Sequence, residues 1–483
     1  MSSIQATDWL SHQARATPHR TALVAGDLRW SWGELDRRTG ETAAQLAAVG
    51  VLPGARVGLL LANGPEFVLL VHALIRLRAV LVPLNTRLGA SELHWPVEDS
   101  GLRLLVHDEA NAARAVEVGD ATAVTTVPVG ALDAQEGAER AIIASAPMDL
   151  SATQGIVYTS GTTGRPKGAI LTYGNHFWST TGSAINLGVH RNDTWLAVLP
   201  FYHVGGLAIL MRSAIYGTLV VVQARFDPAA VNAAIDSGVT LVSVVGAMLR
   251  RMLDERGGRP FPPSLRAVLL GGGPAPLPLL EECKGLGMPV LQTYGMTETA
   301  SQAVTLAAED ALRKPGSAGK PLLPTELRIE AGEIQVRGLN VSPGYHNHPP
   351  ETSRTPDGWL RTGDLGRIDD DGYLYVLDRR DDLIVSGGEN VNPAEVEAAL
   401  LAHPSVLEAG VTGRPDAQWS AVPVASVVLR SDHRVTADEL RVFCRQRLAR
   451  YKIPAEIDFL PELPRTGSGK LLRRVLRDRW AAR

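Results

Sequence analysis

At 483 residues the chain is too long for one compact hydrophobic core of ordinary size, so its length predicts at least two domains. Hydrophobic residues make up 45% of the chain and charged residues 20%, which places it among globular proteins. The net charge of −3 suggests neither a basic face for nucleic acid nor an acidic tail. Cys283 and Cys444 lie far apart, and the chain has no Cys-x-x-Cys pair. We therefore expect no disulfide framework or zinc site, but two reduced thiols in or near a core.

The N-terminal segment lacks the basic start and apolar run of a secretory signal. The most apolar stretch, residues 67–84, contains His72, Arg76 and Arg78, whereas a membrane-spanning helix needs about 20 largely uncharged residues. We therefore expect a cytoplasmic protein without a membrane span.

Strand-like apolar runs alternate with helical patterns along most of the chain. Residues 56–62 read as a strand, a helical pattern follows to Arg78, and residues 79–84 read as the next strand. The strand pattern returns at 241–245 and at 267–270, which runs into three glycines at 271–273. This alternation predicts a layered α/β architecture with parallel strands, whose ligands collect at the carboxyl ends of the strands.

Residues 315–380 change in character, because short strand patterns are broken there by glycine, proline and aspartate. They predict a small β-rich subdomain. Beyond it, Asn392, Pro393 and Glu395 suit the cap, first position and capping-box position of a helix. From this helix to the end, the pattern reads α, β, β, α, β, loop, α. We predict an N-terminal domain over 1–380 and a C-terminal domain over 381–483.

The strongest chemical signal is the segment YTSGTTGRPKG at 158–168. Its glycines let backbone amides approach an anion, its hydroxyls donate hydrogen bonds, and Lys167 supplies positive charge. These groups suit the β- and γ-phosphates of a nucleotide, although a flexible turn is the bland alternative. The common P-loop pattern fits neither this segment nor PRTGSGK at 464–470, where Pro464 and Leu471 replace required residues.

The 158–168 segment resembles the phosphate-loop signature of the adenylate-forming enzymes, which include acyl-CoA synthetases and luciferase. Further motifs of that superfamily follow in its order: LPFYHVGG (199–206), QTYGMTETA (292–300), WLRTGDLG (359–366), YLYVLDRRDDLIVSGGENVNPAEVE (373–397) and PRTGSGK (464–470). Within the superfamily, TYGNH (172–176), LLGGGPAPLPLL (269–280) and QTYGMTETASQAVTL (292–306) most resemble o-succinylbenzoate-CoA ligases of menaquinone biosynthesis.

The resemblance implies a large N-terminal domain of layered α/β subdomains and a small, mobile α+β C-terminal domain. It also implies a two-step ligase reaction. A carboxylate first attacks the α-phosphate of ATP to give an acyl-adenylate and pyrophosphate, and the thiol of coenzyme A then displaces AMP. Magnesium is the implied cofactor, and the implied partners are small molecules rather than nucleic acid. A homo-oligomer is left open.

Most implied roles concern ATP. The β- and γ-phosphates would be held by Thr159, Ser160, Gly161, Thr162, Thr163, Gly164 and Lys167. Glu298 would bind magnesium, a hard cation that prefers oxygen ligands, and Thr297 would hydrogen-bond the α-phosphate. Asp364 and Arg379 would bind the ribose hydroxyls. The adenine and acyl pocket would be lined by Gly271, Gly272, Gly273, Gln292, Thr293, Tyr294 and Gly295, with Gly272 and Gly295 also facing the acid.

Local composition allows simpler interpretations of three implied site residues: Glu298, Asp364 and His203. Glu298 would otherwise be an exposed or cap-forming glutamate, and Asp364 a turn residue after Thr362 and Gly363. His203 would stand near the reacting carboxylate, but a lone histidine between apolar neighbours is more often packed and satisfied.

o-Succinylbenzoate carries a second carboxylate on its ring, which would be costly to bury alone. Arg212 is a cation within an apolar run shortly after His203. We predict that Arg212 serves this spectator carboxylate. The alternative is an arginine that reaches from a helix to the surface.

The resemblance also implies that the C-terminal domain rotates between the two steps about a hinge at Asp381. One face would bring Lys470 to the adenylate, and the other would bring Gly387 and Gly388 to line the thiol tunnel. An exposed charge cluster is the alternative at Asp381. Two other functions remain open at this point: a CoA ligase for another aryl or fatty acid, and a catalytically inactive nucleotide-binding regulator.

Overall fold

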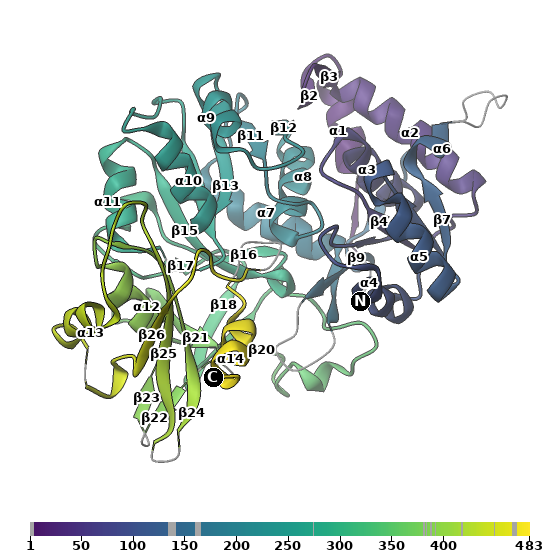
Figure 1. The fold of residues 1–483 in the computed structure, drawn as a ribbon. Coiled ribbons are helices and arrows are strands. Elements are labelled where there is room, and N and C mark those ends of the chain that lie inside the picture. Colours follow the sequence, from purple (N-terminus) through teal and green to yellow (C-terminus); the bar gives the residue numbers. More distant parts are fainter. Residues whose placement is uncertain are drawn as a thin grey trace.

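The computed structural model describes residues 4–133, 142–159, 166–273, 275–379, 382, 384–386, 389–391, 393–416, 419–448, 450–465 and 471–483. Its two largest sheets lie side by side and carry helices on their faces (Figure 1). The nine-stranded sheet has the order β17 (Lys320–Pro321), β16 (Ser301–Thr305), β15 (Val290–Met296), β14 (Ala267–Gly271), β13 (Leu241–Val245), β11 (Thr194–Ala197), β12 (Leu219–Val222), β2 (Thr21–Ala25), β3 (Leu28–Ser31).

The six-stranded sheet has the order β10 (Lys167–Thr172), β9 (Thr153–Thr159), β5 (Val80–Pro83), β4 (Arg56–Leu60), β6 (Leu104–His107), β7 (Thr125–Pro128). Strands β9, β5, β4, β6 and β7 are parallel, and β10 adds an antiparallel edge. The predicted βαβ unit is present as β4, α3 (Pro65–Leu77) and β5. Nearly every residue of β4 and β5 is buried, as expected of parallel strands covered on both faces.

Three hydrophobic clusters show how the layers are stacked. The largest lies between the two sheets and includes residues of α1 (Trp9–Ala16), α2 (Trp32–Ala48), α3 and α8 (Val204–Tyr216). A second joins the nine-stranded sheet to α9 (Pro228–Asp236), α10 (Gly246–Arg256) and α11 (Leu277–Gly285). A third joins the six-stranded sheet to α4 (Ala90–Ser100) and α5 (Ala112–Thr122). The layered α/β class predicted from the sequence is confirmed.

Smaller elements complete the N-terminal part. They are α6 (Val129–Asp133), α7 (Tyr173–Leu187), the strand pair β1 (Gln5–Ala6) and β8 (Met148–Asp149), and the short 3-10 helices η1 (Glu109–Asn111), η2 (Thr297–Thr299), η3 (Ala308–Asp310) and η4 (Pro350–Thr352). A four-stranded antiparallel sheet follows, formed by β18 (Glu326–Glu330), β19 (Glu333–Arg337), β20 (Leu360–Ile368) and β21 (Leu374–Arg379).

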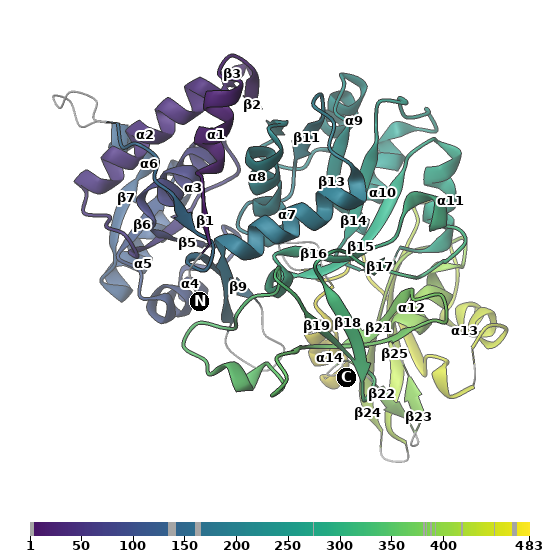
Figure 2. The same ribbon diagram turned by 180° about the vertical axis from the view of Figure 1, so that it is seen from behind.

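The last part of the chain lies below α11 and beside this four-stranded sheet in both views (Figure 2). Its sheet contains β22 (Ile384–Ser386), β23 (Glu389–Val391), β24 (Val406–Asp416), β25 (Ser420–Leu429) and β26 (Glu456–Phe459). Its helices are α12 (Pro393–Leu401), α13 (Ala437–Arg445), η6 (Arg450–Lys452) and α14 (Arg473–Ala481). The predicted order α, β, β, α, β, α from Pro393 onward is therefore correct. The cap position Asn392 lies outside the described residues, and the domain boundary at 380/381 stays a prediction.

Cys283 and Cys444 are both free and buried, as expected. Burial raises the pKa of each thiol, to about 12 and about 11 respectively, so both stay protonated at neutral pH. Among the described residues, no helix is long and apolar enough to cross a bilayer.

Candidate active site

The glycine-rich segments predicted to line the nucleotide and acyl pocket lie at the carboxyl ends of two neighbouring strands. Gly271 ends β14, with Gly272 and Gly273 directly after it, and residues 292–295 lie within β15, which ends one residue later at Met296. Because β14 and β15 pair in parallel, both segments reach the same edge of the sheet. This is the edge where ligands bind in parallel α/β sheets.

Two of these positions require glycine. Gly272 has a φ of +86°, and a Cβ atom there would lie 3.1 Å from Cγ1 of Val245. A Cβ atom on Gly295 would collide with the carbonyl oxygen of Ser301 on the neighbouring strand β16. The missing side chains therefore let the backbones of this wall approach one another closely.

Glu298 lies in η2, directly after β15, together with Thr297. Its side chain is 5% exposed, and its Oε1 accepts a 2.5 Å hydrogen bond from the hydroxyl of Tyr345. The interpretation as an exposed or cap-forming glutamate is therefore wrong. Among the described residues no three His, Cys, Asp or Glu gather as a metal cluster. A single buried carboxylate still fits magnesium, which takes one or two carboxylates together with substrate phosphates.

The phosphate-loop segment connects β9 to β10, and Thr159 pairs with Lys167 at its base. The predicted loop residues Ser160, Gly161, Thr162, Thr163 and Gly164 lie outside the described residues. Lys167 itself is described, and its Nζ lies 5.6 Å from the ring centroid of Tyr345. One tyrosine thus contacts both the predicted phosphate lysine and the predicted metal ligand.

Helix α4 holds both ends of the phosphate-loop segment. The indole nitrogen of Trp95 donates a 2.9 Å hydrogen bond to the carbonyl of Pro166, after the loop. The hydroxyl of Tyr158, before the loop, donates a 2.7 Å hydrogen bond to Asp99, which also accepts one from Asn347. Burial and the neighbouring Asp99 raise the pKa of Tyr158 far above its usual value, so its phenol remains a donor.

Asp364 lies within strand β20, opposite Arg379 on β21. The interpretation as a turn residue is therefore wrong. Its carboxylate is 8% exposed and accepts a 2.8 Å hydrogen bond from the hydroxyl of Tyr294. Tyr294, predicted only as a pocket residue, thereby links the predicted adenine wall to the predicted ribose ligand. The side chain of Arg379 lies outside the described part, so its role stays a prediction.

His203 occupies the N-cap position of α8 and is half-buried, with its Nε2 shielded from solvent. Burial, with a smaller contribution from Arg87, lowers its pKa to about 4, so its imidazole is neutral at neutral pH. Its Nε2 has no hydrogen-bond partner among the described residues, and neither has the buried Nε2 of Gln292. His203 does pack edge-on against Tyr202, with ring centroids 4.6 Å apart, but no described residue satisfies its Nε2. Buried polar atoms without partners are expected where a ligand supplies the partner.

Arg212, in the third turn of α8, is 2% exposed and does not reach the surface. Its Nη2 donates a 3.0 Å hydrogen bond to Oε1 of Gln302, and its guanidinium lies 5.2 Å from the ring centroid of Trp195. Gln302 stands opposite Gly295 in the β15–β16 pair, which places Arg212 beside the predicted acyl pocket. Its Nε lacks a partner, and no carboxylate pairs with the guanidinium within the described structure.

The remaining predicted residues, Lys470, Asp381, Gly387 and Gly388, lie outside the described residues, and their roles stay predictions. Sequence reasoning missed the supporting side chains: Tyr345, Trp95, Asp99, Gln302 and Trp195. Only Gln302 lay within a motif, and its place opposite Gly295 depends on a bulged β15–β16 register that no local pattern reveals.

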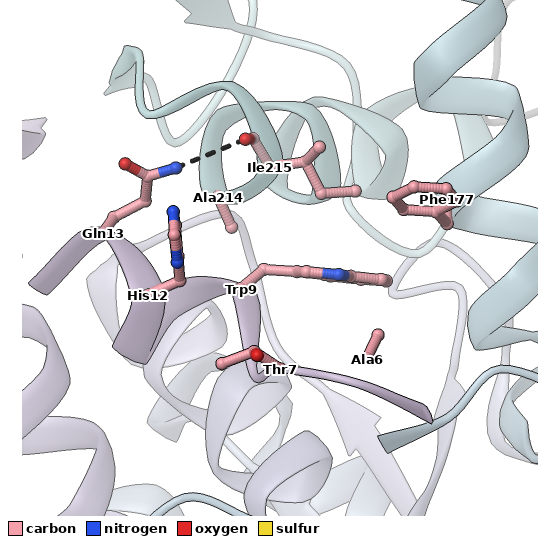
Figure 3. A pocket seen from close by; sticks show the side chains of 8 residues that line it. All are labelled: Ala6, Thr7, Trp9, His12, Gln13, Phe177, Ala214 and Ile215. Atoms are coloured by element: carbon pink, nitrogen blue, oxygen red, sulfur yellow. Dashed lines mark hydrogen bonds between the residues drawn. The ribbon is translucent and has the colours of Figure 1, made fainter. Parts of the chain in front are cut away.

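A separate pocket of about 210 Å³ lies where β1, α1, α7 and α8 meet (Figure 3). The ring of Trp9 lies along it, and Gln13 donates a 3.3 Å hydrogen bond to the carbonyl of Ile215 at its rim. None of the predicted site residues lines this pocket. The candidate active site is therefore the edge formed by β14, β15, η2 and the start of α8.

Comparisons with known proteins identify the family of this chain. The AMP-binding enzyme family matches residues 10–346, and the AMP-binding enzyme C-terminal domain matches residues 395–470. The chain is similar to the 2-succinylbenzoate–CoA ligase of Geobacillus kaustophilus (strain HTA426), with 50% identity over 482 residues that cover 97% of each protein.

It is also similar to the o-succinylbenzoate CoA synthetase of Bacillus subtilis, at 46% identity. The complex of that enzyme with the acyl-adenylate OSB-AMP has a TM-score of 0.92 and covers 98% of this chain and 99% of that one. Its complex with ATP and magnesium has a TM-score of 0.91, at 98% and 100% coverage. A double mutant of the same enzyme with the product analogue OSB-NCoA has a TM-score of only 0.76, at 98% and 99% coverage.

Proposed function

Because this chain belongs to the AMP-binding enzyme family, we propose that it is a 2-succinylbenzoate–CoA ligase. It activates the aliphatic carboxylate of this diacid with ATP and transfers the acyl group to coenzyme A. The observation that carries the choice of acid is Arg212, a buried guanidinium that pairs with no carboxylate within the described structure. A buried charge without a partner is costly, and a carboxylate of the substrate would offset that cost.

In the first step an oxygen of the aliphatic carboxylate attacks the α-phosphorus of ATP, and the bond to pyrophosphate breaks. Two anions approach each other, so their charge must be screened. Magnesium, when bound, neutralises charge on the phosphates. Glu298 is the residue that would hold it, and Lys167 would face the β- and γ-phosphates. The neutral imidazole of His203 can donate from Nε2 and orient the reacting carboxylate.

In the second step the thiol of coenzyme A attacks the acyl carbon, the bond to the AMP oxygen breaks, and the thiol proton leaves. We propose that Lys470 acts only in the first step and that Gly387 and Gly388 line the path of the thiol. The lower TM-score of the relative bound to a product analogue supports this, because identity and coverage are the same in both comparisons. A change in the arrangement of the domains would lower the score in this way.

Pyrophosphate release across a panel of acids tests the proposed substrate. The panel contains 2-succinylbenzoate, its analogue 4-oxo-4-phenylbutanoate, which lacks the ring carboxylate, and fatty acids. We expect 2-succinylbenzoate to be preferred. Arg212→Ala should lower kcat/KM for the diacid about a hundredfold or more, and much less for the monocarboxylate. Arg212→Lys should recover part of the loss, because lysine keeps the charge but not the planar fork.

The ratio of the two acids is an internal control, because a folding defect would lower both activities equally. Equal losses on both acids would remove Arg212 from substrate recognition. Preference for a fatty acid would overturn the proposed substrate. Because ATP and coenzyme A are the proposed co-substrates, we also propose a cytoplasmic location, which fractionation of cells would test.

A further inference from the structure

The segment 342–346 joins the two large sheets at the candidate active site. The amide of Ser342 donates a 2.7 Å hydrogen bond to the carbonyl of Glu298, which lies between strands β15 and β16 of the nine-stranded sheet. Gly344 accepts a 3.0 Å bond from Ile170, and His346 donates a 2.8 Å bond to Gly168, both on strand β10 of the six-stranded sheet. The backbone on both sides of Tyr345 is therefore fixed relative to both sheets.

Two contacts of the half-buried Tyr345 involve predicted site residues. Its hydroxyl donates a 2.5 Å hydrogen bond to Oε1 of Glu298, and its ring centroid lies 5.6 Å from Nζ of Lys167. The first contact requires the hydroxyl. The second requires only the face of the ring, which attracts a cation through its quadrupole.

We propose that Tyr345 is a positioning residue for adenylate formation: its hydroxyl orients the Glu298 carboxylate toward magnesium, and its ring orients the Lys167 ammonium toward the phosphates. The proposal rests on the proposed function, which assigns the metal to Glu298 and the phosphates to Lys167.

The hydroxyl bond matters because a metal-ligating carboxylate binds best when a second residue fixes its rotation. Because the hydroxyl is bonded to Oε1, it constrains the rotation of the carboxylate that would face a hard cation. Loss of such a supporting hydrogen bond typically lowers metal affinity about 10- to 100-fold. The ring contact has a smaller effect, because a cation–π contact at a partly exposed site contributes about 0.5–1 kcal/mol, or about two- to fivefold in affinity.

Two substitutions separate these contributions. Tyr345→Phe keeps the ring and removes the hydroxyl, whereas Tyr345→Leu removes both. Tyr373→Phe is the matched control, because the hydroxyl of Tyr373 donates a 2.6 Å hydrogen bond to a carboxylate oxygen of Asp310, away from the candidate site. The probe is Mn²⁺, an oxygen-preferring substitute for magnesium, titrated into full-length enzyme with ATP and followed by electron paramagnetic resonance. ATP binding in the presence of a chelator is measured separately by calorimetry.

We expect Tyr345→Phe to raise the Mn²⁺ concentration at half-saturation about tenfold and to leave metal-free ATP binding unchanged. Tyr345→Leu should show the same metal defect and bind metal-free ATP about two- to fivefold more weakly. Saturating magnesium should restore most of the kcat of Tyr345→Phe, which a merely structural defect would not allow. Tyr373→Phe should match the wild type in both measurements.

Wild-type Mn²⁺ affinity in Tyr345→Phe would overturn the role of the hydroxyl. Equal metal-free ATP binding by the Phe and Leu variants would overturn the role of the ring. Neither titration contains the carboxylic acid substrate. The role of Tyr345 and the proposed 2-succinylbenzoate ligase activity are therefore tested by different measurements. If wild-type enzyme released no pyrophosphate with 2-succinylbenzoate, the proposed function would fail while the Mn²⁺ result still decided the role of Tyr345.

Discussion

Burial determines the protonation of single residues in this protein. His72 and His176 are buried and His203 is half-buried, and desolvation lowers the pKa of each to about 4. Nearby cations lower it further: Arg76 for His72, Arg212 for His176 and Arg87 for His203. All three imidazoles are therefore uncharged at neutral pH, the pH at which the proposed reaction would occur.

These histidines predict how stability depends on pH. An unfolded histidine has a pKa near 6.5, so between about pH 6.5 and pH 4 the unfolded chain binds protons that the folded chain does not. The free energy of unfolding should therefore fall as the pH is lowered through this window, by up to about 1.4 kcal/mol per pH unit for each histidine. Replacement of His72 by glutamine removes one of these groups outside the candidate site.

Thermal melts of wild type and His72→Gln between pH 4.5 and pH 7.5 measure this contribution. Melting temperatures should fall toward acid pH in both proteins, but less steeply in the variant. Parallel curves would show that His72 titrates equally in the folded and unfolded states, which would contradict its lowered pKa.

The local sequence did not predict which polar side chains of the candidate site are buried. Composition around Arg212 allowed a surface arginine, and composition around Asp364 allowed a turn, yet both side chains are buried. Each side chain is hydrogen-bonded to a residue distant in sequence: Arg212 donates to Gln302, and Asp364 accepts from Tyr294. Two motif residues do meet, because Glu298 and Lys167 both contact Tyr345, and the glycines of β14 and β15 lie at the same edge of their sheet. Their functional roles stay predictions.

At the scale of elements, α4 is the support of the phosphate-loop segment. It contacts residues on both sides of that segment, through Trp95 and Asp99. Helix α4 can therefore influence the segment through the positions of its two ends, Tyr158 and Pro166. The sequence indicated the loop itself but gave no sign of this support, because α4 ends almost 60 residues before Tyr158.

Trp95→Phe should weaken ATP binding about fivefold, because it removes one hydrogen bond with a net contribution of about 1 kcal/mol. The aromatic ring remains, so the melting temperature should change little. Trp419→Phe, at an exposed position, is the control. Calorimetric titration of ATP gives the affinity of each variant. Unchanged affinity in Trp95→Phe would mean that α4 does not position the loop.

The strand and helix order was largely predictable, because hydrophobic periodicity and glycine or proline breaks are local signals. The βαβ unit over residues 56–84 and the element order after Pro393 both match the structure. The antiparallel edge β16–β17 and the segment 342–346 were not predicted, since their partners lie far away in sequence. Strand β16 carries Gln302, which accepts a hydrogen bond from Arg212, and the segment 342–346 carries Tyr345, which donates one to Glu298.

For the molecule as a whole, we propose two arrangements of the C-terminal part, one for each step of the reaction. Asp382, next to the proposed hinge at Asp381, pairs with Arg477 of α14 at 3.0 Å and with Arg473 at 3.7 Å. The chain after Asp381 is thus tied to the C-terminal part, which supports Asp381 as the point of rotation. Lys470 belongs to the same C-terminal part, so a rotation about Asp381 would bring it to the adenylate or remove it.

The proposal that Lys470 acts only in adenylate formation is tested most directly by comparing the two half-reactions in wild type and Lys470→Ala. Adenylate formation is measured as 2-succinylbenzoate-dependent exchange between ATP and pyrophosphate, and thioester formation as coenzyme A consumption from supplied acyl-adenylate. We predict exchange in the wild type, and in Lys470→Ala a loss of exchange far greater than any loss of thioester formation. Equal loss of both half-reactions, or wild-type enzyme without 2-succinylbenzoate-dependent exchange, would contradict the account.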